Sequence, residues 1–400
     1  MKKLLTLVWI LIFTCAAFGQ ETVDYILKAR AMTEEGKPDL AVNQLTKAIS
    51  EFNDSRLFLE RAGANMMKGD YSAAISDYNE ANKLTPLSGE YGLSRIYALK
   101  GDAATALYHL GLNLGSRYRK GEKDVLLDPA FGVIDNRAEW RQFWKKEWYT
   151  AIERGVSEIE FYVTSGKIEE SKSVLSELKN DYQDNDEVLY AEALISLSSG
   201  KYPEAIKIIT ALTASNPENE KYLRLLAKVQ TSSSNPAGAS ATYSQLLNSG
   251  VADARLLILR AESYRKTGET EKAMSDVNKY LSYYSGDKAA LSLAGKIEAS
   301  SGDNLMALDY FSQNVKAHPN DADCYVDRAN SYFVSKSWDW AIKDYSMSLD
   351  LKPENSDVWL NKGISLLNSG RADDACHDFR RSLTLGNKRA SEYISKTCIK

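Results

Sequence analysis

The side chains most able to do chemistry are few in this sequence and lie far apart. The 400 residues include four cysteines and three histidines, His109, His318 and His377. His377 follows Cys376 directly, but adjacent residues of a helix point about 100° apart, and no further ligands follow at metal-binding spacing. The motifs of zinc proteases, serine hydrolases, phosphate-binding loops and dinucleotide-binding folds do not occur. We therefore expect no catalytic, cofactor or metal site, with an enzyme assembled from distant residues as the remaining alternative.

An aromatic series follows a helical spacing in the first half of the chain. Trp140, Phe143, Trp144 and Trp148 recur every three or four residues, and they would form one stripe on a helix over residues 138–149. Such a stripe can stack on sugar rings or hold a partner helix. Stripes at this spacing more often pack into a core, and we favour that interpretation. The three tryptophans remain the candidate aromatic binding surface.

A basic cluster precedes this stripe and consists of Arg117, Arg119, Lys120 and Lys123. The whole chain has a net charge of -4 and a pI near 5.7, without a basic excess over any domain, so nucleic acid is not an expected partner. A cluster of this kind is usually a solvated loop. The alternative is that it touches an acidic surface of the cell envelope.

Small residues recur at a constant interval of 34 residues, which is the main signal for the fold. The first series is Ser171, Ala205, Ala239, Ala273, Ala307, Ala341 and Ala375. A second series lies twelve residues before its last six members, at Ala193, Ala227, Ala261, Gly295, Ala329 and Gly363. Two antiparallel helices that pack closely need a small residue at the crossing point of each helix. The period therefore predicts a helix pair in every repeat.

Turn residues stand between the two series in the same register. They are Gly166, Gly200, Ser234, Gly268, Gly302 and Gly370, with Lys336 as the exception. Glycine at this place lets the chain leave a helix in the left-handed conformation. The first part of the chain has comparable triplets, Ala29-Gly36-Ala41, Ala62-Gly69-Ala74 and Ser94-Gly101-Ala106. The sequence thus predicts an all-helical fold.

This pattern resembles the tetratricopeptide repeat family. The clearest repeat is 356–385, with Trp359, Gly363, Leu366, Gly370, Ala375 and Phe379 at the signature positions of the family. The resemblance covers most of the chain and implies a solenoid of about ten helix-turn-helix repeats. It is specific for the fold and says little about function.

The repeat spacing also suggests the domain organisation. We expect three repeats in residues 20–114, an irregular insert or degenerate repeat with an aromatic helix in 115–150, and seven repeats in 151–385. Residues 386–400 should form a helix that caps the exposed apolar edge of the last repeat. Whether the repeats before and after the insert form one continuous superhelix stays open.

The first residues are typical of an export signal. Lys2 and Lys3 precede an apolar run over 4–13, and small residues follow, so we expect residues 1–19 to be a cleaved signal peptide. The protein should then be exported, and the periplasm is the expected location. Lipid attachment at Cys15, secretion and an uncleaved membrane anchor are the alternatives.

Cys376 and Cys398 are the candidate disulfide. They lie on the second helix of the last repeat and on the capping helix, which should pack together, and an exported protein meets an oxidising environment. Two reduced, buried cysteines are the alternative. Cys324 is expected to be a free core cysteine.

Repeat arrays of the family usually bind on a concave face formed by the first helices. Fixed repeat positions there select Arg255, Glu262, Arg265, Asp323, Asn330, Phe333, Asp357, Asn361 and Ile364 as candidate partner-binding residues. Some members hold the carboxylate of a peptide C-terminus with lysine, asparagine and arginine on successive first helices. Here Val326 occupies the lysine position, so we expect that clamp to be absent.

The resemblance and the export signal together suggest a non-enzymatic scaffold or adaptor of the bacterial cell envelope. It would bind partner proteins or peptides on the concave face, and an accessory role in a secretion or outer-membrane assembly machine is the suggested context. The alternative is a glycan- or peptidoglycan-binding protein that uses the tryptophan-rich insert. No cofactor is expected.

Overall fold

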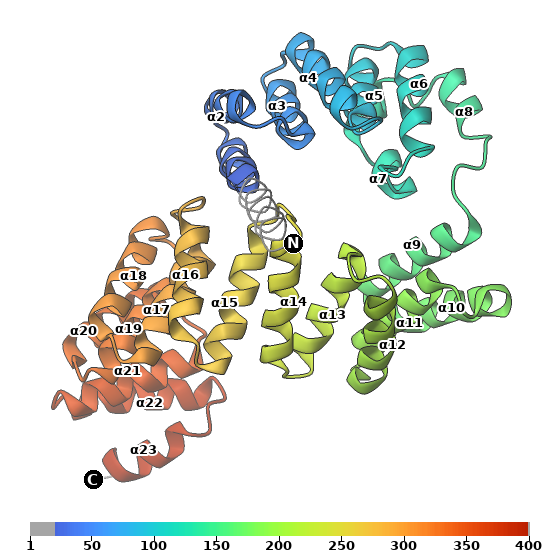
Figure 1. The fold of residues 1–400 in the computed structure, drawn as a ribbon. Helices are drawn as coiled ribbons and strands as arrows, with labels where there is room; N and C mark the ends of the chain where they lie inside the picture. The colour runs from blue at the N-terminus through green and yellow to red at the C-terminus, as the bar shows by residue number, and fades with distance from the viewer. Residues whose placement is uncertain (1–20, 399–400) are drawn as a thin grey trace, which may run out of the picture. The chain divides into compact units, whose positions relative to one another are not determined.

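The computed structural model describes residues 21–398, and in this part of the chain all regular structure is helical (Figure 1). The predicted signal peptide, residues 1–19 with Cys15, lies outside the described residues. Within 21–398, no helix combines the length and apolar character that a membrane span requires. The chain divides into two compact bodies, an N-terminal body over Met1–Leu256 and a C-terminal body over Leu257–Lys400.

The helices of the N-terminal body form antiparallel pairs on both sides of the insert. Residues 21–34 are helical, and α2 (Pro38–Glu51), α3 (Ser55–Met67), α4 (Tyr71–Leu84), α5 (Glu90–Leu99) and α6 (Ala103–Leu114) follow. The insert contains α7 (Glu122–Leu126), the 3-10 helix η1 (Pro129–Val133) and α8 (Ala138–Phe143). Three further pairs are α9 (Ala151–Thr164) with α10 (Ile168–Tyr182), α11 (Asp186–Ser198) with α12 (Tyr202–Ser215), and α13 (Glu220–Ser232) with α14 (Pro236–Asn248).

The C-terminal body continues the same pairing, beginning with α15 (Arg255–Thr267), which contains the division between the bodies. Its helices after α15 are α16 (Thr270–Leu281), α17 (Lys288–Ser301), α18 (Asn304–Ala317), α19 (Ala322–Val334), α20 (Trp338–Leu351), α21 (Ser356–Asn368), α22 (Ala372–Thr384) and α23 (Ala390–Thr397). The all-helical repeat fold expected from the 34-residue period is confirmed.

The small residues lie where the two helices of a pair touch. The alanines of the first series from Ala205 to Ala375 are fully buried. At Gly363 of α21, a Cβ atom would lie 2.6 Å from the ring of Phe379 on α22, so no larger residue fits unless the ring moves. Gly370 has φ of +84° in the following turn, as expected for a left-handed residue. Lys336 takes φ of +58° at the same position of its repeat, where a side chain is strained.

Buried ion pairs cross four of the helix pairs, always between residues sixteen positions apart. They join Arg61 to Asp77, Arg260 to Asp276, Arg328 to Asp344, and Lys362 to Asp378. In the three arginine pairs both carboxylate oxygens accept hydrogen bonds, at 2.6 to 3.0 Å. Each aspartate is at least 95% buried. These charges therefore connect the two helices of a repeat and are not free to bind a partner.

The aromatic series of the insert does not lie on one long helix. The helix predicted over 138–149 ends at Phe143, because the chain turns back there. The Trp148 ring stacks on Phe143 with centroids 4.7 Å apart, and its indole N–H donates to the Phe143 carbonyl at 3.1 Å. Trp140 is 8% exposed and lies against Phe131. The rings pack into a core together with α6 and η1, in which Trp140 is buried and Phe143, Trp144 and Trp148 are half-buried.

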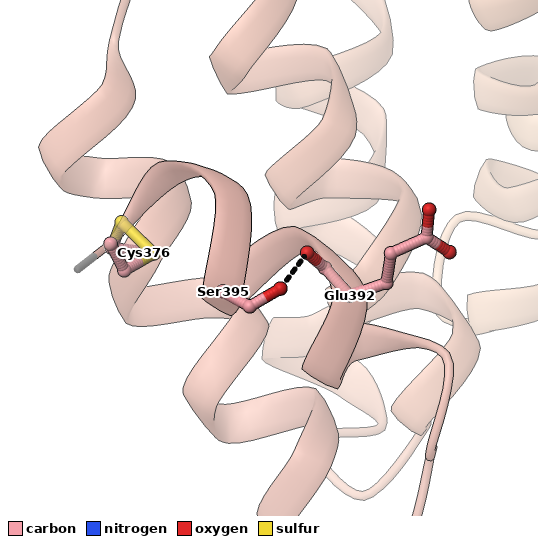
Figure 2. The surroundings of a disulfide bond; sticks show 4 residues. Cys376, Glu392 and Ser395 are labelled. Carbon is pink, nitrogen blue, oxygen red and sulfur yellow. Dashed lines mark hydrogen bonds between the residues drawn. A yellow bond between two sulfur atoms is a disulfide. The ribbon is translucent and has the colours of Figure 1, made fainter.

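The last helix, α23, covers the end of the array (Figure 2). The Tyr393 ring stacks on Phe379 with centroids 5.0 Å apart, and a disulfide joins Cys398 to Cys376 on α22. Cys324 is a buried free thiol, and burial raises its pKa to about 11, so it stays protonated at neutral pH.

Candidate functional site

Three adjoining cavities of the N-terminal body share Lys123 as a lining residue, and we call them together the insert groove. Their volumes are about 580, 480 and 430 Å³. The largest lies between the segment 119–127 and α9. A second extends to α5, and the third extends over the first helices α11 and α13. The groove thus lies where the insert meets the first-helix face of the following repeats.

Hydrogen bonds and ion pairs hold the insert segment beside α9. Arg119 pairs with Glu153 and also donates to the Leu114 carbonyl at 2.9 Å and the Trp148 carbonyl at 2.8 Å. Tyr149 donates to the Lys120 carbonyl at 2.7 Å. Glu153 also completes a capping box with Thr150 at the start of α9. The Glu153 carboxylate therefore caps the N-terminus of α9 and also binds Arg119 of the neighbouring loop.

The α11 and α13 end of the groove contains a network of charged and phenolic side chains. Lys221 lies 2.7 Å from Glu187 and 3.3 Å from Glu160. Its ammonium also stands 4.0 Å above the Tyr190 ring, and Tyr222 donates to Glu187 at 2.9 Å. Burial, with the nearby carboxylates, raises the pKa of both tyrosines well above the usual value. The phenols stay protonated at neutral pH, so this network offers hydrogen-bond donors and charged groups that can bind polar groups.

The α5 end of the groove is held by Asp128. Its carboxylate lies 2.7 Å from Arg95 and accepts a hydrogen bond from Tyr91 at 2.8 Å. The pKa of Tyr91 is raised by burial and by this hydrogen bond. Among residues 21–398, no three histidine, cysteine, aspartate or glutamate side chains are placed to hold a metal ion. The arrangement suits recognition of a chain segment by charge and apolar contact.

The candidate partner-binding residues lie outside this groove. Arg255, Asp323, Asn330 and Asp357 are exposed, whereas Glu262, Arg265, Phe333, Asn361 and Ile364 are half-buried. Several have partners within the chain: Arg265 pairs with Glu262 at 2.8 Å, and Asn330 accepts a hydrogen bond from Tyr345 at 2.7 Å. No cavity described above includes them, so they remain predictions without a shared site.

The tryptophans of the candidate aromatic surface do not line the three cavities of the groove either. Trp144 meets Trp140 and Phe143 edge-on, with centroids 5.7 and 5.6 Å apart. Because these rings contact one another, the geometry favours the core interpretation of the stripe, and the glycan-binding alternative stays a prediction.

Of the groove residues, Arg119, Lys120 and Lys123 belong to the basic cluster found in the sequence, whereas those on the first helices α9, α11 and α13 were not predicted. The first-helix positions used above for three later repeats select Glu160, Glu187, Tyr190 and Lys221 in the repeats beginning near residues 152, 186 and 220. The apolar residues Leu126 and Leu127 belong to the insert, for which the repeat provides no register. Only the fold brings them next to Phe161.

Comparison with known proteins agrees with this architecture. Residues 190–247 match the family model described as tetratricopeptide repeat. No protein of curated function matches the sequence. A solved tetratricopeptide repeat protein from Parabacteroides merdae is 20% identical, with 62% of this chain and 99% of that chain covered and a TM-score of 0.50. At this identity the similarity concerns the fold alone.

Two further solved structures are similar at lower scores. One is the C-terminal part of a repeat-containing protein from Cytophaga hutchinsonii, 13% identical, with 60% and 99% of the two chains covered and a TM-score of 0.48. The other is the APC/C hetero-tetramer Cut9-Hcn1, 14% identical, with 94% and 83% covered and a TM-score of 0.48.

Proposed function

The chain is a tetratricopeptide repeat protein, and on this premise we propose that it is a non-catalytic scaffold that holds an extended segment of a partner protein. The insert groove is the observation that carries the proposal. It combines exposed apolar side chains with charged groups on the first helices α9, α11 and α13. Such a surface can bind a peptide through side-chain pockets and charge-assisted hydrogen bonds.

We further propose that the protein acts in the bacterial cell envelope, after export to the periplasm. The N-terminal sequence supports export, and the Cys376–Cys398 disulfide is compatible with an oxidising compartment. An accessory role in a secretion or outer-membrane assembly machine would suit a scaffold that carries no chemistry of its own. This part of the proposal rests on the compartment and the fold.

Site-specific crosslinking in intact cells tests the scaffold. A photoreactive amino acid in place of Ser157, which lines two of the three cavities, should capture a discrete partner protein. The same replacement at Lys207, an exposed residue of the second helix α12 outside the groove lining, is the matched control. If Ser157 captures the same abundant proteins as Lys207, or none, the groove is not the binding surface.

Fractionation of the same cells tests the location. The captured complex should appear in the periplasmic or envelope fraction, and the mature chain should begin after residue 19. A chain that retains its first residues and stays in the cytoplasm would contradict the export proposal without affecting the groove.

A further inference from the structure

Two lysines at the α7 end of the insert groove form no ion pair within the described part of the chain, whereas the arginines beside them do. The three arginines there are paired, as Arg95 with Asp128, Arg119 with Glu153 and Arg154 with Glu122. Lys120 and Lys123 are exposed, and neither forms an ion pair with any residue of 21–398. Asp124 and Glu158 also line this end without an ion pair, but in the cavity beside α5 the two free ammonium groups of Lys120 and Lys123 face only the free carboxylate of Asp124.

Aromatic rings hold both lysines in place without using their hydrogen-bond donors. The Lys120 ammonium lies 5.4 Å from the centre of the Tyr91 ring, and that of Lys123 lies 4.9 Å from the centre of the Phe161 ring. A ring face attracts a cation but replaces none of its strong acceptors, so the N–H groups remain available to an anion. Both lysines line the same two cavities, so acidic groups of one bound segment can approach them.

Apolar side chains surround these lysines. Leu127 is 69% exposed, Leu126 is 52% exposed and Phe161 is 45% exposed, and all three line the largest cavity. Covering such side chains excludes water from them and would also strengthen a nearby ion pair. The opposite end of the groove has the reverse charge, because Glu160 and Glu187 share the single ammonium of Lys221.

We infer that the insert groove binds an extended protein segment in which an acidic residue stands beside a large aliphatic or aromatic residue. Acidic groups of the segment bind Lys120 and Lys123, and the apolar side chain lies on Leu126, Leu127 and Phe161. Complementary charge places the acidic part of the segment at the α7 end, away from Glu160 and Glu187. The inference rests on the proposed scaffold function and adds the chemistry of its partner.

Fluorescence anisotropy with three labelled peptides tests this chemistry on the full mature chain. The peptides GEELFELG, GQQLFQLG and GKKLFKLG share their apolar residues and differ only in charge. At low ionic strength the acidic peptide should bind roughly tenfold or more tightly than the neutral one, and the basic peptide should bind most weakly. Added salt should weaken the acidic peptide most, since exposed charges are screened.

Variants assign the effect to the two lysines. Lys120→Gln with Lys123→Gln should abolish the preference for the acidic peptide while binding of the neutral peptide is unchanged. Lys146→Gln is the matched control, because Lys146 is also an exposed lysine of the insert that lies over a ring, 3.9 Å from the centre of Trp148, but it does not line the groove. Phe161→Ser should weaken the acidic and the neutral peptide alike. Circular dichroism should show the same helical content in all variants.

Each of the other possible results would contradict a specific part of the inference or of the proposed function. If the three peptides bind equally and Phe161→Ser weakens them all, the groove binds apolar segments and the inferred charge preference is wrong, whereas the scaffold proposal stands. If the preference survives in the double lysine variant, the anion binds elsewhere. If no peptide binds and Ser157 captures no partner in cells, the inference and the proposed function fail together.

Discussion

Arg328 and Asp344 cross the helix pair α19/α20 with both carboxylate oxygens occupied, whereas Lys120 and Lys123 in the insert groove have no carboxylate partner. The first pair is buried and identical in spacing to the pairs in three other repeats. The lysines lie on a segment that follows no repeat and is held by hydrogen bonds to the end of α6 and to the loop before α9, and by an ion pair with α9. The two regions contain similar residue types but use them differently.

This difference indicates how a repeat array separates stability from binding. A buried charge without its partner is costly, so charges inside a repeat must be paired within it. The insert interrupts the 34-residue register, and the chain there can expose lysines and leucines without weakening a helix pair. The regular repeats should therefore respond to substitution through stability, and the groove should respond through binding.

The largest expected effect is the loss of one partner of a repeat ion pair. Arg328→Met should lower the free energy of unfolding by about 3–5 kcal/mol, because Asp344 stays buried without its partner. Adding Asp344→Leu should restore most of this loss. Arg371→Met, which breaks the exposed pair of Arg371 with Asp339, is the control and should cost less than about 1 kcal/mol. Equal effects of the two arginine variants in urea unfolding would contradict the comparison.

The disulfide provides the next largest effect, at the end of the C-terminal body. The bridged cysteines are 22 residues apart, and closing a loop of this length stabilises by about 3 kcal/mol. Cys376→Ser with Cys398→Ser should therefore increase amide hydrogen exchange in α22 and α23, while peptide binding in the insert groove is retained. Reductant should loosen the wild-type protein in the same way and leave the double variant unchanged. If amide hydrogen exchange increases equally over α9–α14 in the double variant, the capping helix stabilises more of the chain than the repeat it covers.

Exchanging residues at the repeat turns should change stability in opposite directions. Lys336→Gly should raise the free energy of unfolding by about 0.5–1 kcal/mol, because glycine adopts φ of +58° without strain. Gly370→Ala, at φ of +84° with no atom within 4 Å of a new Cβ, should lower it by about 1 kcal/mol through backbone strain alone. Thermal unfolding of both variants measures these two changes in stability. A destabilising Lys336→Gly would mean that the lysine side chain makes a stabilising contact.

Asp378 should make the free energy of unfolding depend on pH, and the direction of its pKa shift gives the sign of that dependence. Burial raises its pKa above the usual value, against the opposing effects of Lys362 and His377. The folded state therefore binds this proton more strongly than the unfolded chain does. The resulting contribution to stability is complete below the unfolded pKa of about 3.8 and is lost as pH rises through the folded pKa. Asp378→Asn should remove this component from the pH dependence of unfolding, and an unchanged profile would contradict it.

The smallest expected change in stability belongs to the groove. Leu127→Ser should alter the free energy of unfolding by no more than about 0.5 kcal/mol, because the side chain is 69% exposed. It should nevertheless weaken binding of the acidic peptide. A loss of stability comparable with that of Arg328→Met would show that the insert is part of the repeat core and would remove the contrast between the two regions.

The sequence by itself determined the helix pairs, their register and the position of the interruption. Small residues every 34 positions can serve only a repeated close packing of helices, and Gly363 against Phe379 shows this contact directly. The same periodicity placed the capping segment beside the last repeat, where Cys376 and Cys398 meet. Local spacing was sufficient for these features because every repeat contacts mainly its neighbours.

Only the tertiary structure decided which side chains form the insert groove. Lys123 and Phe161 are separated by an irregular segment whose path no period describes, and the aromatic helix expected there ends at Phe143 because Trp148 folds back on it. The pairing of Arg328 with Asp344 and the absence of a pair at Lys120 likewise depend on distances between helices. A repeat pattern specifies how neighbouring helices pack, but an insert is positioned by contacts that have no counterpart elsewhere in the chain.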